Sequence, residues 1–166
     1  MIKHSVPEHH LVHIGDMTVS FALLEAAIQI LVWYLIGERQ SIGQIITAEL
    51  SFKSLRALAI SLYLERNGED SDYPTLKAFM KKAATFEDRR NQITHSIWAA
   101  GKDSQSITRI KTTAKVKNGL QFQFKDVQVK DLANFVSDIE QLAEDIQIFW
   151  IHLLENGKLV SNHISI

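Results

Sequence analysis

The residues best suited to chemistry lie together within residues 86–95. A helix turns about 100° per residue, which places Arg90 in the middle of the apolar face formed by the neighbouring Leu, Phe, Met, Ala and Ile side chains. Glu87 falls on the same face, and Asn91 and His95 fall at its edge. Charged groups on a packing face require partners, because their burial is otherwise unfavourable. This break in the pattern therefore indicates a candidate functional site.

Arg90, Asn91 and His95 suit the cleavage of a phosphodiester without a metal ion. A guanidinium presents a planar fork to phosphate, and an imidazole transfers protons near neutral pH. We expect Arg90 to hold the phosphate and His95 to act as base or acid, with Asn91 fixing the phosphate or orienting the imidazole. The alternative is structural: an ion pair between Glu87 and Arg90, three residues apart, and a hydrogen-bonded histidine at the core boundary.

Residues 17–37 are mostly apolar, and Glu25 is their one charged residue. The length is close to the ~20 residues of a membrane span. A central carboxylate disfavours membrane insertion, so we interpret the stretch as a buried helix of a bundle or dimer interface. Glu25 is then a candidate buried partner of Arg90 or of His95; the alternative is a partly exposed residue without a role.

The composition is that of an ordinary soluble globular protein. The 166 residues predict a single domain over 1–166, with 46% hydrophobic and 22% charged residues. A net charge of −1 excludes a globally basic nucleic-acid binder but not a local basic patch. The absence of Cys excludes disulfides, thiolate zinc sites and a cysteine nucleophile, and suits a cytoplasmic location.

Helical periodicity dominates the chain and predicts a mostly α fold: a bundle of four to five helices with one inserted β-hairpin at about 107–129. A polar N-terminal segment, 1–15, precedes the first helix. The expected helices cover about 15–36, 41–67 with Ser51 capping its second part, 75–99 and 130–155. Gly37, Asn67-Gly68, Gly101 and Asn156-Gly157 follow their ends.

The hairpin carries a basic face. A three-residue loop, 117–119, would pair Val116 with Leu120, keep basic and apolar residues on separate faces, and place Gly119 in the left-handed region. Five residues form the basic face: Arg109, Lys111, Lys115, Lys117 and Lys125. We expect this face to bind a phosphate backbone with little sequence readout; the alternative is a solvated outer face.

The stretch from Arg90 to His95 resembles the R-polar-x-x-x-H motif of the HEPN superfamily, small all-helical domains found in RNA-cleaving toxins and phage-defence proteins. The similarity includes the Asn directly after the Arg and covers roughly residues 15–100 and the final helix. It implies a HEPN-like domain and a metal-independent endoribonuclease that uses the RNA 2′-OH as nucleophile. By resemblance, Arg90 binds and polarises the phosphate, Asn91 supports it, and His95 transfers the proton.

The resemblance also implies a homodimer with a composite active site. The protein would be a cytoplasmic toxin or phage-defence effector that acts on RNA and needs no metal or other cofactor. It would not enter a membrane, and its partner would be an antitoxin or another defence-system protein. From their places on the predicted helices, and not from the resemblance, we expect Glu87 and Glu25 to support the site. The chain departs from the family at Ile97, where members that pair with nucleotidyltransferase antitoxins carry Tyr, and in the basic hairpin, which is outside the common core.

Two other interpretations stay open. Several HEPN members have lost catalysis, so the chain could be a module that dimerises or binds a partner protein or a nucleotide. It could also be a small metal hydrolase, because His9 and His13 have the i,i+4 spacing of two zinc ligands and Asp16 follows. The simpler interpretation of these histidines is structural or solvated.

Overall fold

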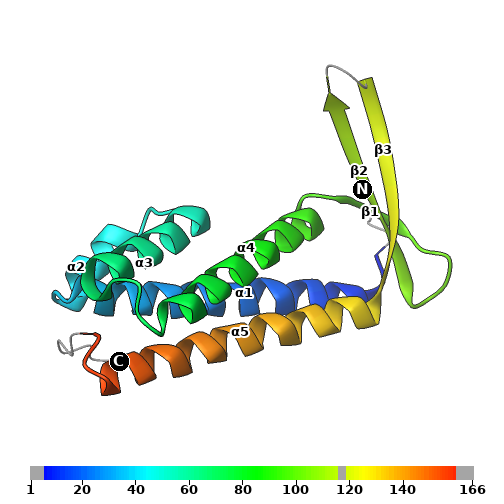
Figure 1. Ribbon diagram of the computed structural model, residues 1–166. Helices are drawn as coiled ribbons and strands as arrows, with labels where there is room; N and C mark the ends of the chain where they lie inside the picture. Colours follow the sequence, from blue (N-terminus) through cyan, green and yellow to red (C-terminus); the bar gives the residue numbers. More distant parts are fainter. Residues whose placement is uncertain (1–5, 116–118, 160–166) are drawn as a thin grey trace. The chain divides into compact units, whose positions relative to one another are not determined.

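The computed structural model describes residues 6–115 and 119–159. Within these residues the chain is mostly helical, with five α-helices and one three-stranded antiparallel sheet (Figure 1). The elements are, in chain order, α1 (Glu8–Ile36), α2 (Gln40–Thr47), α3 (Phe52–Asn67), α4 (Tyr73–Thr94), β1 (Ile97–Ala100), β2 (Ser106–Lys115), β3 (Gly119–Gln128) and α5 (Val129–Glu155). This confirms the predicted fold class, a helical protein with an inserted hairpin.

The chain divides into two compact units. The hairpin unit comprises Met1–Ser20 and Asp88–Asp138, and the helical unit comprises Phe21–Glu87 and Ile139–Ile166. Helices α1, α4 and α5 each contribute residues to both units. The single domain over 1–166 stays a prediction.

The core of the helical unit is built on the second half of α1. Leu24, Ile28 and Leu31 are fully buried there, together with Tyr63 of α3 and Leu76 of α4. Complete burial of such a side chain contributes about 1.5–3 kcal/mol. Helix α1 is long and apolar enough to cross a membrane, but 44% of its most apolar stretch is buried within the chain. This burial is compatible with a core helix of a soluble protein.

Glycine and serine end and begin the helices of the helical unit as the sequence predicts. Gly37, Gly68 and Gly157 follow α1, α3 and α5 with φ values of 72°, 69° and 68°. Glycine adopts this left-handed conformation without a steric cost. At the other end of α3, the Ser51 hydroxyl accepts a hydrogen bond from the Ser54 backbone N–H at 3.1 Å.

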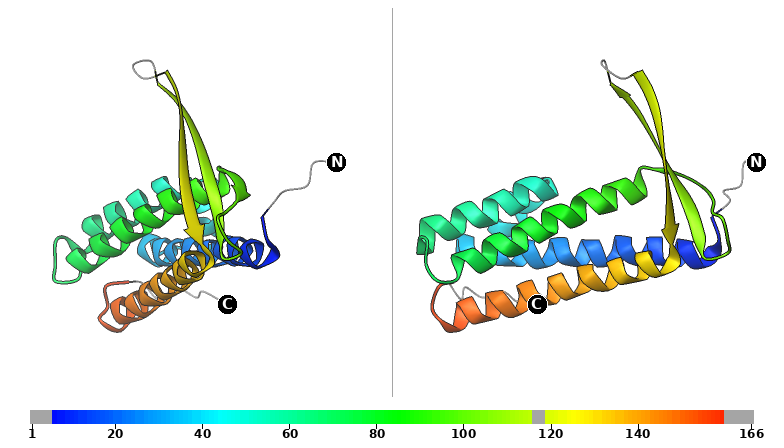
Figure 2. Two further views of the ribbon diagram at one scale, coloured as in Figure 1. Left: turned by 90° about the vertical axis from the view of Figure 1, so that its right-hand side faces the viewer. Right: turned by 45° about the vertical axis from the view of Figure 1, so that its right-hand side comes forward.

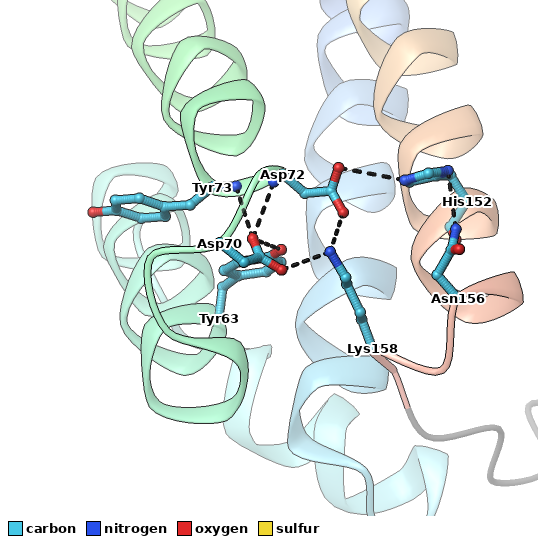
Figure 3. Close-up of polar contacts among 7 residues, drawn as sticks. All are labelled: Tyr63, Asp70, Asp72, Tyr73, His152, Asn156 and Lys158. Atoms are coloured by element: carbon cyan, nitrogen blue, oxygen red, sulfur yellow. Dashed lines mark hydrogen bonds and ion pairs between the residues drawn. The ribbon is translucent and has the colours of Figure 1, made fainter.

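A charged cluster ties the segment after α5 to the loop between α3 and α4 (Figure 3). The Lys158 ammonium lies 2.6 Å from an Asp70 carboxylate oxygen and also contacts Asp72. The Tyr63 hydroxyl donates to Asp70 at 2.8 Å. The hydrogen bond from Lys158 is the main cause that lowers the pKa of Asp70 to about 2. His152 Nε2 lies 3.3 Å from the other oxygen of Asp72, so α5 joins the same cluster.

Helix α1 begins at Glu8, earlier than the predicted start after the polar segment 1–15. The reason is a tertiary contact inside the hairpin unit. The ring Nε2 atoms of His9 and His10 hydrogen-bond to two successive backbone carbonyls of the β1–β2 loop, at 2.9 and 3.2 Å. His10 is fully buried. These contacts hold the first turns of α1 despite Gly15.

The predicted third helix, 75–99, was wrong at its C-terminal end. Helix α4 ends at Thr94, and Ile97–Ala100 forms β1, which pairs antiparallel with β2. The Trp98 indole N–H donates to the Ile93 carbonyl at 3.1 Å, so it caps the end of the helix from the strand. Branched and aromatic residues such as Ile and Trp fit a strand surface well, and the available partner strand decides between the two structures.

The hairpin of β2 and β3 lies where the sequence predicts it (Figure 2). Gly119 has φ 61°, which confirms the left-handed residue at the turn. The predicted register was off by two residues: Leu120 pairs with Ala114 and not with Val116. Because side chains alternate with period two, this shift leaves every side chain on its predicted face.

Candidate active site

The end of α4 and strand β2 line one pocket of about 330 Å³ in the hairpin unit. Its lining residues are Asp88, Asn91, Gln92, His95, Ser96 and Lys111. Asn91 and His95 were predicted from the helix pattern, and Lys111 was predicted from the basic face of the hairpin. Residues that were predicted independently, from the helix pattern and from the basic face of the hairpin, therefore line the same pocket.

Asn91, which lines the pocket, holds the guanidinium of Arg90, although Arg90 itself does not line the pocket. The Arg90 guanidinium donates from Nη1 to Asn91 Oδ1 at 3.0 Å, and both side chains are half-buried. His95 directly follows the last residue of α4, and its backbone N–H donates to the Asn91 carbonyl at 3.1 Å. Its side chain is exposed at the pocket. The site thus combines an oriented guanidinium with an imidazole that a substrate can reach.

A hydrogen bond joins the basic face to α4. The Arg109 guanidinium donates from Nη1 to Gln92 Oε1 at 2.6 Å. Gln92 also lines the pocket, so the contact fixes β2 beside the predicted catalytic residues. Gln92 occupies an unspecified position of the motif, and its contact with a strand that is distant in sequence could not be predicted.

Arg89 holds the same end of α4 against the start of α5. Its guanidinium donates from Nη2 to the Asp131 carbonyl at 2.9 Å, and its Cζ lies 4.1 Å from the centre of the Phe135 ring. A guanidinium this close to an aromatic face gains a cation–π interaction. Arg89 thus has a structural role beside the predicted site, which the sequence analysis missed.

The basic face is present in the described part of the hairpin. Arg109 lies directly opposite Lys125 in the β2–β3 register, and Lys111 lies opposite Gln123. Residues in directly opposed positions share a face, and two cations placed so repel each other. An anionic ligand would relieve this repulsion. Lys117 and the side chain of Lys115, also predicted for this face, lie outside the described part of the structure.

The two predicted supporting carboxylates belong to the helical unit. Glu87 accepts a hydrogen bond from Arg56 Nη2 at 2.7 Å, and Arg56 also donates to the Met80 carbonyl. The sequence indicated that Glu87 needs a cation, but not that α3 supplies it. Glu25 is half-buried on α1. The support of Arg90 or His95 by these carboxylates stays a prediction.

The histidines of α1 have other partners than a metal ion. His9 hydrogen-bonds to the Ser104 carbonyl, and His13 lies 3.6 Å from a carboxylate oxygen of Asp16. Across residues 6–115 and 119–159, no group of three or more His, Asp or Glu side chains could hold a metal ion. His9, His13 and Asp16 therefore do not form the metal site that the third interpretation requires.

The pocket is lined by an ammonium, an imidazole, two carboxamides, a hydroxyl and the Asp88 carboxylate, and the Arg90 guanidinium is hydrogen-bonded to one of the carboxamides. Such a set can bind a phosphate and move a proton beside it. No family model, curated protein or solved structure matches the chain. The pocket and the resemblance of its motif to that of HEPN domains are therefore the indications of function.

Proposed function

We propose that the chain is a metal-independent endoribonuclease of the HEPN type. The observation that supports this most is the shared pocket: Asn91 and His95 of the motif line it together with Lys111 of the basic face. A backbone-binding surface that leads to an acid–base residue is the arrangement that RNA cleavage needs.

In the proposed reaction the 2′-oxygen of the RNA attacks the adjacent phosphorus. His95 accepts the proton of the 2′-OH as the new P–O bond forms, and the bond from phosphorus to the 5′-oxygen breaks. Water donates a proton to the leaving 5′-oxygen, which gives a 2′,3′-cyclic phosphate and a 5′-OH. The Arg90 guanidinium, oriented by Asn91, neutralises the charge that develops on the phosphate oxygens.

The resemblance also supplies the proposed setting. The enzyme would act in the cytoplasm as a homodimer with a composite active site. It would serve as a toxin or phage-defence effector, with an antitoxin or another defence-system protein as its partner. The alternative is a non-catalytic HEPN module that dimerises or binds a partner protein or a nucleotide.

Cleavage of a labelled single-stranded RNA in EDTA tests the proposal. The wild type should yield products that end in 2′,3′-cyclic phosphate. His95→Ala should lower the rate by about 10²–10⁴-fold, the usual contribution of an acid–base residue. Arg90→Ala should lower it by about 10²–10³-fold, the usual contribution of a group that stabilises developing charge. His152→Ala removes a histidine of the helical unit, outside the pocket, and should cleave at the wild-type rate.

The opposite outcome is equally informative. If folded wild-type protein leaves RNA intact at high enzyme concentration, the ribonuclease proposal is wrong and the binding module takes its place. A toxin also lowers the growth of its host. Expression of the wild type should therefore slow growth relative to His95→Ala, and equal growth would contradict the free toxin.

A further inference from the structure

Strand β3 forms one edge of the sheet in the hairpin unit. The strand order is β1-β2-β3, and no strand of the described residues pairs with the outer side of β3. The backbone N–H and C=O groups of an exposed edge are a template for a further strand, and proteins commonly protect such edges with proline, bulges or short strands. β3 has ten residues and no proline, and its register with β2 runs without a bulge. The edge is therefore open to pairing.

One face of this sheet is apolar and exposed. Leu120, Phe122 and Phe124 alternate along β3 and are 63%, 57% and 68% exposed. Ile97 of β1 shares their side, because it pairs with Ile110 of β2, which in turn pairs with Phe124. We refer to Ile97, Leu120, Phe122 and Phe124 as the apolar face. Contiguous exposed apolar residues on soluble proteins commonly mark interaction sites.

The opposite side of the same strands is the basic face, which lacks acidic residues. Lys125 lies opposite Arg109, and Gln123 lies opposite Lys111. The one carboxylate in the sequences of β2 and β3 belongs to Asp126, and alternation places it on the apolar side. The positive charge of the basic face is therefore not compensated within these two strands.

We propose that β3 binds a strand of a partner protein in which apolar residues alternate with Asp or Glu. The side chains of an added strand point alternately to the two faces of the sheet. Its apolar residues would cover Phe122 and Phe124, and its carboxylates would lie beside Lys125 and the other cations of the basic face. In recognition by strand addition, backbone hydrogen bonds supply affinity and the alternating side chains supply specificity. This occupant matches the edge and both faces of β3.

A second copy of the chain does not match the charge. Antiparallel pairing of β3 with β3 about a two-fold axis keeps each face on its own side. It would gather Arg109, Lys111 and Lys125 of both copies on one face, without an acidic residue from either hairpin. Like charges close together on a sheet are destabilising. An alternating acidic strand instead neutralises this face, and the homodimer of the proposed function would use another surface.

The bound strand would inhibit the proposed ribonuclease. Its carboxylates would occupy the basic face that is proposed to hold the RNA backbone, beside the pocket that Lys111 lines. This part of the inference rests on the proposed function. Strand binding itself is measurable without RNA, so failure of the interface is distinguishable from failure of the ribonuclease.

A labelled ten-residue peptide in which valine alternates with glutamate tests the interface with the full chain. Fluorescence anisotropy should show saturable binding at pH 7.5, and hydrogen exchange should show new protection of amides along β3. A peptide of five valines followed by five glutamates has the same charge but cannot divide its side chains between the two faces. It should bind about tenfold more weakly, as the loss of several cross-strand contacts predicts. Equal binding of both peptides, or binding that leaves the β3 amides unprotected, would overturn the proposal.

Variants of the two faces test the side-chain contacts. Phe122→Ser/Phe124→Ser should weaken binding of the alternating peptide about tenfold, because two aromatic cross-strand contacts are lost. Gln121→Ser/Gln123→Ser alters exposed, uncharged residues on the other face and should bind like the wild type. Circular dichroism checks that both variants keep the fold. Equal affinity of the two variants would contradict a role of the apolar face.

A charge reversal tests the basic face. Lys125→Glu should weaken binding of the valine–glutamate peptide and strengthen binding of a valine–lysine peptide, each by about tenfold. Lys53→Glu, an exposed residue of α3, should bind both peptides like the wild type. If Lys125→Glu changes neither affinity, charge complementarity is absent and the proposal is wrong.

Competition with single-stranded RNA tests the inhibition. The alternating peptide should displace RNA from the wild type and slow its cleavage, and a peptide that binds β3 while RNA stays bound would overturn the inhibition. If the protein binds the peptide at β3 but neither binds nor cleaves RNA, the ribonuclease proposal fails and the interface stands. If it cleaves RNA but does not bind the peptide, the interface fails alone.

Three results would assign β3 to another occupant and overturn the proposal. Protection of the β3 amides in the protein alone that is lost on dilution would indicate a second copy. Loss of RNA affinity in Phe122→Ser/Phe124→Ser would assign the apolar face to RNA. Binding to phosphatidylcholine–phosphatidylglycerol vesicles that requires both phenyl rings would assign it to a membrane. The proposal expects none of these.

Discussion

The guanidinium of Arg109 donates a hydrogen bond to the carboxamide oxygen of Gln92 at 2.6 Å. Arg109 belongs to β2, and Gln92 lies on α4 between Asn91 and His95. The contact therefore connects the surface proposed to bind RNA with the residues proposed to cleave it. Because the cation is already held by a neutral acceptor, its charge remains available to phosphate.

Loss of the hydrogen bond between Arg109 and Gln92 should lower the cleavage rate more than the RNA affinity. Gln92→Ala removes the acceptor and keeps every cation, so RNA affinity should stay within about twofold while the cleavage rate falls about tenfold, as misplacement of a bound substrate does. Single-turnover rates and filter-binding affinities separate the two effects. Gln147→Ala, an exposed glutamine of α5 in the helical unit, is the control. A parallel fall of affinity and rate would instead make Gln92 a direct RNA ligand.

Lys111 should contribute to RNA affinity through its charge and to the cleavage rate through its position at the pocket. Each phosphate contact adds about 0.9 to the slope of log affinity against log salt concentration on a duplex and about 0.7 on a single strand. Lys111→Gln should lower this slope by about one contact and also slow cleavage, because Lys111 lines the pocket. Lys125→Gln should lower the slope with a smaller effect on the rate. Lys53→Gln, an exposed lysine of α3, should change neither.

Features that depend on neighbouring residues, such as the glycines at helix ends and turns, could be predicted from the sequence. Features that depend on a partner distant in sequence could not. Gly37, Gly68 and Gly119 all have the positive φ that a helix end or hairpin turn requires. The end of α4 depends on β1 finding a place beside β2, which local periodicity does not encode. Likewise, the partner of Glu87 is Arg56 on another helix, and the spacing within α4 suggested only Arg90.

In the candidate site, too, the local pattern could be predicted from the sequence and the contacts between side chains could not. The motif of Arg90, Asn91 and His95 was visible in the sequence because a charge on an apolar helix face breaks the pattern. The hydrogen bond from Arg90 to Asn91 and the inclusion of Lys111 in the pocket required the structure. Alternation with period two predicted the basic face correctly even though the register was shifted, since a shift of two residues preserves the faces.

The buried His10 should make stability depend on pH. Burial lowers the pKa of His10 below its usual 6.5, and the nearby His9 and His13 act in the same direction, against the hydrogen bond to the Gln105 carbonyl. Below pH 6.5 the unfolded chain therefore binds a proton at this residue that the folded chain does not. The free energy of unfolding should fall as the pH decreases from 6.5 toward the folded pKa, and this contribution should stop changing below that pKa.

Urea unfolding at pH 7.5, 6.5 and 5.5 measures the effect. His10→Gln keeps a donor for the Gln105 carbonyl and removes the titrating group, so its stability should fall less between pH 6.5 and 5.5 than that of the wild type. His152→Gln, in the helical unit, should retain the His10-dependent fall. An identical pH dependence of wild type and His10→Gln would exclude His10 as the cause.

Two glycines should respond to alanine in opposite directions. A Cβ at Gly101 would lie 2.2 Å from the Ser106 carbonyl oxygen, a backbone atom that cannot move without disturbing the β1–β2 connection. Gly101→Ala should therefore lower the free energy of unfolding by about 1–3 kcal/mol, as overpacking does. Gly15 lies within α1, and a Cβ there meets nothing within 4 Å. Gly15→Ala should raise stability by about 0.5–1 kcal/mol, because alanine restricts the unfolded chain and favours the helix.

Thermal and urea unfolding of both variants and of the wild type measure these two changes in the free energy of unfolding. A destabilised Gly15→Ala would contradict the continuous helix from Glu8, and an unchanged Gly101→Ala would contradict the close approach of Gly101 to β2.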